Sequence, residues 1–373
     1  MPAATDSISA TRTGVRGPRP QRKRPGRSTP PVQRTDRWIV GPWFDLAFFA
    51  NLTWPIFALL WGAGVYFSAD PAHPNTPINF TVGIWALFLL ATPHRWITPM
   101  LVFLDGDRFK QRPNAYVGLF VLFLALTLTF VSLDLVVLLL IMDWIWNAWH
   151  FAAQHSGISR IYGRVVNPAD KSSGMFEKVV LRMFVVYVIL RLGGAPVMGL
   201  DRERWLWWLD KALPYFRFAD YPMLLLPVIL LAREARGLSR ASLGRFVYLS
   251  SICLLYSAIV VTVHMPHSKI NVGMAEGLIF AIGIVHSTEY LAIVSWSVKK
   301  RFATSTHGVF SYLAPRWGMA LGIFAFALGF GGLMMHLHYE RAWVIVTLFV
   351  SYLHYGYDGM IWKVRRPATA AVA

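Results

Sequence analysis

Five of the eleven histidines lie inside apolar stretches that are long enough to be membrane-spanning helices: His94, His150, His155, His286 and His354. Imidazole nitrogen is a common protein ligand for iron, zinc and copper ions. A polar group without a partner in hydrocarbon costs several kcal/mol, so these side chains must find partners inside the protein. The pattern therefore predicts a metal site that is built by histidines from several helices.

Polar residues accompany these histidines at helical spacing. Two segments have the i, i+4, i+7, i+11 spacing that places side chains on one helix face: Asp143, Asn147, His150 and Gln154, and Thr347, Ser351, His354 and Asp358. Glu289 and Tyr290 follow His286 by three and four residues, and Gly283 on the same side predicts the close approach of another helix. Because lipid would penalise these faces, they are expected to point into the helical bundle.

Four of the histidines are predicted to lie at a common depth in the cytoplasmic half of the bilayer. The depth of each histidine follows from its distance in residues from the inner end of its span and a rise of about 1.5 Å per residue. These depths agree within about one helical turn for His94, His150, His286 and His354. We expect these four to bind a metal ion. Carboxylate, amide and phenol groups would hydrogen-bond to the imidazoles or bind the ion themselves. The candidates for this role are Asp143, Asn147, Gln154, Glu289, Tyr290 and Asp358.

Other histidines are more ambiguous. His155 lies five residues after His150, which is about 140° around a helix, so the two cannot point straight at one ion. His155 either binds metal, at this site or at a second one, or caps the helix before Gly157. Four further histidines lie near the outer ends of two spans: His264, His267, His336 and His338. They either form an outward-facing metal site or are ordinary polar loop residues.

The elements that must position these residues are transmembrane helices. The chain is 55% hydrophobic and only 15% charged, whereas soluble domains carry about 25% charged residues. Apolar runs of about 20 residues recur throughout, each long enough to cross about 30 Å of hydrocarbon. The fold class is therefore all-α: a polytopic integral membrane helical bundle of about ten transmembrane helices with both termini cytoplasmic. The predicted spans are residues 43–66, 79–103, 115–133, 134–157, 178–198, 214–232, 243–263, 273–298, 310–335 and 341–362.

The net charge of +17 is concentrated at one side of these spans. Residues 1–37 hold nine Lys and Arg against two acids in a Pro- and Ser-rich sequence, which predicts a disordered basic cytoplasmic tail before the transmembrane domain 38–366 and a short cytoplasmic tail 367–373. Ten spans place 18 further Lys and Arg on the side of the basic tail and six on the other, as the positive-inside rule requires. The partner of this charge is expected to be the lipid bilayer of a bacterial inner membrane, not nucleic acid.

The histidine motifs resemble those of the integral-membrane non-haem iron enzymes, a group that includes fatty-acid desaturases, hydroxylases and bacterial β-carotene dioxygenases of the Brp/Blh type. The resemblance rests on "TPHRW" (92–96), "WHFAAQHSGISRIY" (149–162), "HSTEYL" (286–291) and "HYGYDGMIW" (354–362). The dense HxxHH boxes of desaturases are missing, and isolated histidines on separate helices are more similar to the carotenoid-cleaving type. The resemblance implies iron, O2 and a long apolar substrate.

Three functions remain open from the sequence. The first is a membrane-bound, metal-dependent oxidoreductase or oxygenase that uses iron, with zinc or copper as alternatives, on a lipid-soluble substrate, with or without an electron-donor protein. The second is a b-type haem electron-transfer protein with two axial histidines. The third is a transporter or proton relay. The single cysteine, Cys253, excludes disulfides within the chain and argues against a cysteine-based metal site.

Overall fold

The chain is almost entirely helical in the part that the computed structural model describes, which comprises residues 38–68, 83, 85–166, 174–192, 207–265, 268–302 and 312–362. No strand occurs among these residues, so the all-α prediction is confirmed. The predicted tails 1–37 and 367–373 lie outside the described residues.

The described residues form helices with the following bounds. In chain order they are α1 (Pro42–Phe44), the π-helical segment η1 (Asp45–Phe49), α2 (Trp54–Phe67), the π-helical segment η2 (Trp85–Ala91), α4 (Thr92–Leu104), α5 (Gly106–Gln111), α6 (Pro113–Ser132), α7 (Val136–Val166), α8 (Gly174–Arg191), α10 (Trp207–Arg236), α11 (Leu243–Val263), α12 (Lys269–Phe302), the 3-10 turn η4 (Ala314–Arg316), α14 (Trp317–His338) and α15 (Glu340–Ile361).

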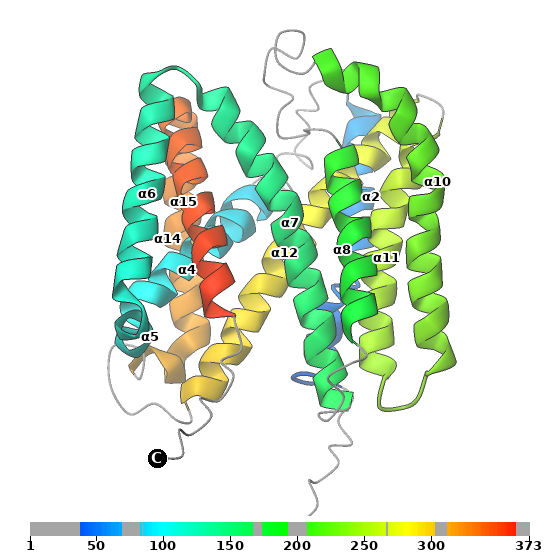
Figure 1. The fold of residues 1–373 in the computed structure, drawn as a ribbon, viewed down its shortest axis with the longest axis horizontal. Coiled ribbons are helices and arrows are strands. Elements are labelled where there is room, and N and C mark those ends of the chain that lie inside the picture. Colours follow the sequence, from blue (N-terminus) through cyan, green and yellow to red (C-terminus); the bar gives the residue numbers. More distant parts are fainter. Residues whose placement is uncertain are drawn as a thin grey trace, which may run out of the picture. The chain divides into compact units, whose positions relative to one another are not determined.

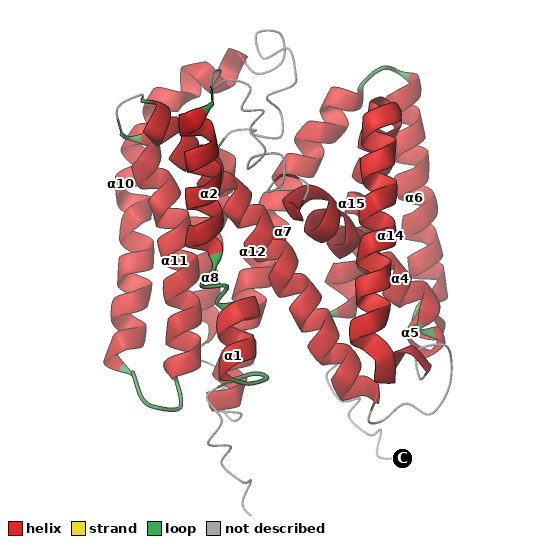
Figure 2. Cartoon of the chain, turned by 180° about the vertical axis from the view of Figure 1, so that it is seen from behind, coloured by secondary structure: helices red, strands yellow, loops and turns green. Residues whose placement is uncertain are grey.

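Two long helices, α7 and α12, contact each other and separate two groups of helices (Figures 1 and 2). On one side α15 packs against α4, α6 and α14, and on the other side α8, α10 and α11 pack against one another while α2 lies along α12. Within its most apolar 18-residue window, α12 is 72% buried, whereas the corresponding window of α14 is 11% buried. α12 therefore lies in the interior of the bundle, and α14 is peripheral.

Seven helical segments of the described residues are long and apolar enough to cross a membrane, which is the composition of a multi-pass integral membrane protein. They are Pro42–Phe67, Ala86–Leu104, Pro113–Ser132, Val136–Val166, Leu243–Val263, Lys269–Lys300 and Trp317–His338. Three further predicted spans correspond to α8, α10 and α15, which are too polar to belong to this set; α8, for example, contains Glu177, Lys178 and Arg182. The total of ten spans and the side on which the termini lie stay predictions.

The closest helix contact joins α2 to α12. Two glycines one turn apart on α12, Gly273 and Gly277, lie against the backbone of Ala58 and Gly62 on α2. A Cβ atom at Gly273 would lie 2.9 Å from the carbonyl oxygen of Gly62, and one at Gly277 would overlap the carbonyl of Ala58. Small residues at i and i+4 allow this approach, as they do in many membrane helix pairs.

The predicted role of Gly283 is wrong. A Cβ atom at this position would have no heavy atom of the described residues within 4 Å, so no helix in that part of the chain packs closely against Gly283. The small-residue contact lies two to three turns earlier in the same helix, at Gly273 and Gly277.

The predicted spans 115–133 and 134–157 leave no residues for a loop, and the structure joins the two helices by a tight hairpin. α6 ends at Ser132 and α7 begins at Val136, with Asp134 in the left-handed region at φ 56°. Asp and Asn tolerate this conformation better than most residues do, because their short side chains can hydrogen-bond locally. The hairpin fixes the start of α7, which then runs for 31 residues and carries five of the eleven candidate site residues: Asp143, Asn147, His150, Gln154 and His155.

Candidate metal centre

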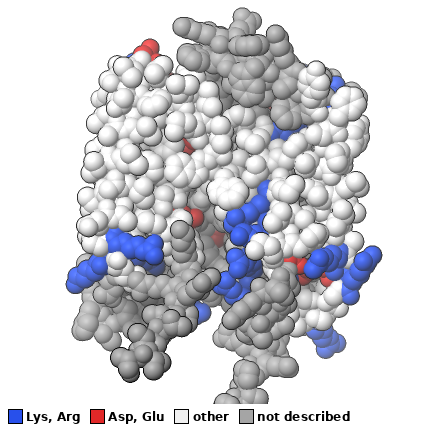
Figure 3. Space-filling model, in the orientation of Figure 1, with Lys and Arg blue, Asp and Glu red and all other residues white. Residues whose placement is uncertain are grey.

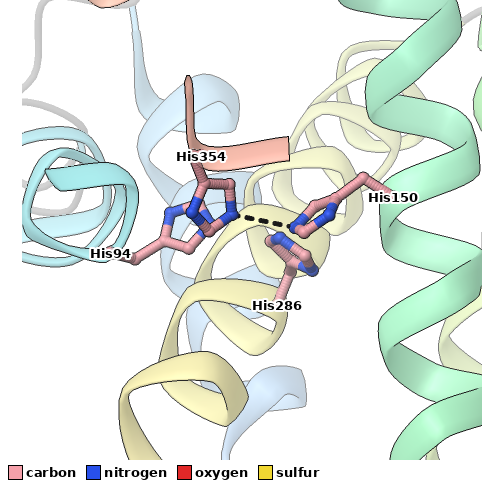
Figure 4. A group of neighbouring side chains, drawn as sticks. All are labelled: His94, His150, His286 and His354. Carbon is pink, nitrogen blue, oxygen red and sulfur yellow. Dashed lines mark hydrogen bonds between the residues drawn. The ribbon is translucent and has the colours of Figure 1, made fainter. Parts of the chain in front are cut away.

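Four histidines from four helices meet inside the bundle. His94 comes from α4, His150 from α7, His286 from α12 and His354 from α15, and their rings point toward one another (Figure 4). All four are buried, with at most 4% of each residue exposed. The structure thus brings together the four histidines that were predicted to share a depth.

The four rings surround one point. One nitrogen of each ring lies within 4.8 Å of the corresponding nitrogens of the others. The ring centroids of His354 lie 4.6 Å from those of both His94 and His150, and those of His286 lie 4.9 and 5.0 Å from the same two rings. The Nε2 atoms of His150 and His354 are closest, at 3.0 Å (Figure 4). The contacts form a closed cycle around a small central space.

The outer nitrogens of three rings have partners that leave the inner nitrogens available. Nδ1 of His94 lies 3.0 Å from the carbonyl oxygen of Ala91, at the junction of η2 and α4. Since a carbonyl can only accept, this nitrogen donates and Nε2 keeps its lone pair. Nδ1 of His150 lies 3.6 Å from a carboxylate oxygen of Asp358. The contact of His94 orients its ring, as the partners of metal-bound histidines do, whereas the contact of His150 is longer than a hydrogen bond.

The outer nitrogen of His354 is held by a chain of hydroxyl groups. Thr98 Oγ1 lies 2.7 Å from Nδ1 of His354 and 2.6 Å from the hydroxyl of Tyr290, which donates to Asp358 over 2.8 Å. Because the Tyr290 proton is used on Asp358, the Thr98 proton must go to Tyr290, and Nδ1 of His354 must donate to Thr98. His354 therefore carries its proton on Nδ1 and presents the lone pair of Nε2 to the centre.

Thr98 is absent from the site that the sequence predicts, although it lies four residues after His94 and so on the same face of α4. That spacing is the one feature of the sequence that could have pointed to Thr98. The contacts of Thr98 with α12 and α15 can be known only from the fold. Tyr290 and Asp358, by contrast, are among the predicted candidates and lie in this chain of contacts. Asp358 connects this chain of contacts to His150, because its carboxylate contacts both Tyr290 and His150.

The fourth ring, that of His286, has no hydrogen-bond partner on either nitrogen among the described residues. Its face stacks on Phe151, with ring centroids 3.6 Å apart and an 8° angle between the planes. Nε2 of His94 also lacks a hydrogen-bond partner in the described part of the chain. A buried nitrogen without a partner costs about 1–3 kcal/mol, and a ligand shared by His94 and His286 would satisfy one nitrogen of each ring.

The geometry fits a metal ion. Imidazole nitrogen binds zinc and similar ions at about 2.0–2.1 Å, so two neighbouring ligand nitrogens lie about 3 Å apart. The 3.0 Å between the Nε2 atoms of His150 and His354 matches this spacing. Neutral imidazoles with fixed outer protons are the form of histidine that binds metal. No other group of three or more His, Cys, Asp or Glu side chains with metal-ligand spacing occurs in the described part of the chain.

The polar face of α7 points inward, as predicted, but only part of it reaches the histidines. Gln154 donates to the backbone oxygen of His286 over 2.8 Å and so ties α7 to α12. Asp143 and Asn147 each have an oxygen 3.1 Å from the hydroxyl of Tyr355, whose ring lies 5.0 Å from that of His150. Asp143 and Asn147 therefore hold α15 against α7 and do not contact the four imidazoles.

His155 belongs to a second buried cluster. Its Nδ1 lies 3.0 Å from Glu289 and 3.2 Å from the hydroxyl of Tyr248, and its Nε2 lies 3.1 Å from the hydroxyl of Tyr256. Glu289 also accepts from Gln154. Both nitrogens of His155 are thus engaged by α11 and α12, and this histidine is not one of the four that share the centre. Neither it nor Glu289 is placed as a ligand of that centre.

The outer histidines do not converge in the described residues. His264, at the end of α11, lies 2.9 Å from the carboxylate of Asp220 on α10. His336 packs between the rings of Phe88 and Trp343, and His338 lies beside Tyr339. His267 is outside the described residues.

Substituting Thr98 by valine tests the chain of hydroxyl groups. The substitution keeps the shape of the side chain but removes the acceptor that fixes the Nδ1 proton of His354 and the donor to Tyr290. Loss of such an outer contact typically weakens metal binding about 10–100-fold. We expect this loss in a competition titration of the purified protein against a chelator.

Thr127→Val is the matched control for Thr98→Val. Thr127 on α6 is equally buried, and its hydroxyl has no hydrogen-bond partner among the described residues. Its substitution should leave metal affinity unchanged. An equal loss of affinity in both variants would show that the Thr98 effect is one of packing.

Comparisons of the chain with protein-family models, with curated proteins and with solved structures found no match. The assignment therefore rests on the chain itself. Four buried imidazoles from four helices, with one nitrogen of each within 4.8 Å of those of the others, form a candidate metal centre inside a helical, multi-pass membrane protein.

Proposed function

We propose that this chain is an integral-membrane, metal-dependent oxidoreductase, and that the ion is iron that is used with O2 on a lipid-soluble substrate. The observation that carries the proposal is the cluster of four nitrogen donors. An all-nitrogen set suits iron, zinc, copper or manganese. Four ligands on an ion that accepts six leave two positions open, which is the requirement for binding O2 and substrate, whereas a structural zinc site is closed.

When bound, iron would supply the activation of O2, and the protein would supply position, protons and a dry environment. The imidazoles of His94 and His354 are each held by an Nδ1 contact, so that the ligand set is organised before the ion arrives. The Tyr290 hydroxyl, at the edge of the centre, accepts a hydrogen bond from Thr98 and donates its own proton to Asp358. Phe151 covers one face of His286 and excludes water from that side.

The geometry favours a single ion over haem. Two axial histidines of a haem lie on opposite faces of the porphyrin, with their nitrogens about 4 Å apart across the iron. Each of the four rings here has two neighbours with centroids 4.6–5.0 Å away. A porphyrin bound between any two of them would need the space that the other two occupy.

The environment of the centre supports an apolar substrate. Three of the four helices that supply the histidines, α4, α7 and α12, are apolar enough to cross a membrane. Large apolar side chains are exposed on these helices where lipid would cover them, including Ile145 and Trp149 on α7. A lipid-soluble molecule can reach such a site from the bilayer, which we propose is the bacterial inner membrane. The electron donor, if the reaction needs one, would be a separate protein.

Oxygen uptake tests the proposed reaction. Purified protein loaded anaerobically with ferrous iron is mixed with O2 and total lipid extract, and O2 is followed with an electrode while products are identified by mass spectrometry. We expect uptake and oxidised lipid-soluble products with iron-loaded protein, and neither with zinc-loaded protein or with His354→Ala. Iron-loaded protein that consumes no O2 above the zinc-loaded control, with or without added reductant, would overturn the oxygenase assignment but not the metal site.

A further inference from the structure

We propose that the surface formed by the C-terminal part of α7 and the first turns of α8 binds the phosphate group of an anionic membrane phospholipid. This site, called here the α7–α8 basic site, consists of Arg160, Lys178 and Arg182. It is separate from the four histidines, and its occupation does not depend on which metal they hold.

The three cations lie close together without an acid between them. α7 and α8 pack along each other, and the side chain of Arg160 lies over Gly174, the first residue of α8: a Cβ atom there would be 3.7 Å from Cγ and Nε of Arg160. The charges of Arg160 and Arg182 both act on Lys178, and that of Arg160 acts on Arg182. In Figure 3, Lys and Arg side chains gather over the lower halves of α7 and α8.

No carboxylate in the described part of the chain pairs with these three cations. The nearest acid on α8 in sequence, Glu177, is engaged by Arg233 at 3.6 Å and Arg245 at 3.7 Å. Like charges held close together repel, and an anion between them relieves the repulsion. α8 also begins at this place, so the positive end of its dipole favours the same anion.

Arg182 is held in a fixed orientation. Its Nε donates to the hydroxyl of Ser156 over 2.8 Å, and its guanidinium lies over the ring of Trp149 at 4.9 Å. Its two terminal amino groups have no partner among the described residues. A guanidinium fixed in this way presents a planar pair of donors, the arrangement that binds phosphate oxygens most strongly.

Exposed apolar side chains next to the cations identify the anion as a lipid. Trp149 is 53% exposed, Met175 63%, Val179 46% and Met183 50%, and all four lie on the same two helices. A free phosphate would gain nothing from these side chains, whereas the acyl chains of a phospholipid would cover them. The site also lies at the end of α7 that is predicted to face the cytoplasm, where anionic lipids are found.

Native mass spectrometry of the detergent-purified full-length protein tests the proposal. The protein is titrated with dioleoyl phosphatidylglycerol, with dioleoyl phosphatidylcholine and, separately, with inorganic phosphate. We expect phosphatidylglycerol to bind at least about 10-fold more tightly than phosphatidylcholine, because the zwitterionic lipid adds a positive charge next to its phosphate. Millimolar phosphate should not displace the bound lipid.

Arg182→Gln and, independently, Lys178→Gln should each weaken phosphatidylglycerol binding by about 5–10-fold, the loss of one charge-assisted contact. Arg236→Gln, at the exposed end of α10, removes one positive charge elsewhere and should have no effect. Unchanged metal content and melting temperature would show that the variants are folded. Equal binding of the two lipids, or the same affinity in Arg182→Gln and Arg236→Gln, would overturn the proposal, as would displacement of the lipid by phosphate alone.

Discussion

We expect His354→Ala to lower the metal content of the purified protein from about one ion per chain to background. His354 supplies an inner nitrogen 3.0 Å from that of His150 and anchors the chain of contacts through Thr98, Tyr290 and Asp358. Its removal deletes a ligand and also releases the groups that orient His150. The loss of affinity should therefore exceed the 10–100-fold that an outer contact contributes. Elemental analysis after equilibration with excess ferrous iron measures it.

The matched control is His155→Gln. His155 is as deeply buried as His354 and lies on the same helix as the candidate ligand His150. Its Nδ1 contacts Glu289 and the hydroxyl of Tyr248, and its Nε2 contacts the hydroxyl of Tyr256. Glutamine retains a donor and an acceptor for these contacts. We expect this variant to keep its metal. Loss of metal from His155→Gln together with retention in His354→Ala would place the ion at the second cluster instead.

The second large effect is expected for Gly277→Val, on stability. The backbones of α2 and α12 meet at this glycine, and any side chain would overlap the carbonyl of Ala58. Because a main-chain carbonyl cannot rotate away, the two helices must separate, and we expect a loss of about 2–4 kcal/mol in the free energy of unfolding. α12 also carries His286, so the displaced helix should bind metal more weakly. Differential scanning fluorimetry in detergent and elemental analysis report the two effects.

Gly283→Ala is the corresponding control on the same helix. A Cβ atom at Gly283 meets no heavy atom within 4 Å, and alanine is the better helix former by about 0.5–1 kcal/mol. The melting temperature should stay the same or rise slightly. A destabilisation equal to that of Gly277→Val would show that the effect comes from loss of glycine in general and not from the contact with α2.

The central elements of the site follow from the sequence because they depend on helical periodicity and on depth. Hydrophobic length fixes where a helix lies in the bilayer, and a rise of 1.5 Å per residue then fixes the level of each histidine. His94, His150, His286 and His354 share that level, and the structure brings their rings together. The inward direction of the polar face of α7 follows from the same periodicity, because lipid excludes it.

The remaining features depend on which helices are neighbours, and periodicity does not encode that. Thr98 gains its role only because Tyr290 and His354 arrive from other helices. His155 points at α11 and α12, whose positions around α7 no local spacing reveals. Gly283 and Gly277 are alike in sequence, and only the path of α2 shows which of them is a contact.

The most direct test of the metal centre is X-ray absorption at the iron K-edge, together with elemental analysis and an absorption spectrum, on the purified full-length protein. The proposed function predicts about one iron per chain, bound by nitrogen at about 2.1 Å, with outer-sphere scattering from about four imidazoles and no Soret band. Protein that retains no metal after loading, or a Soret band with porphyrin scattering, would contradict the four-histidine centre.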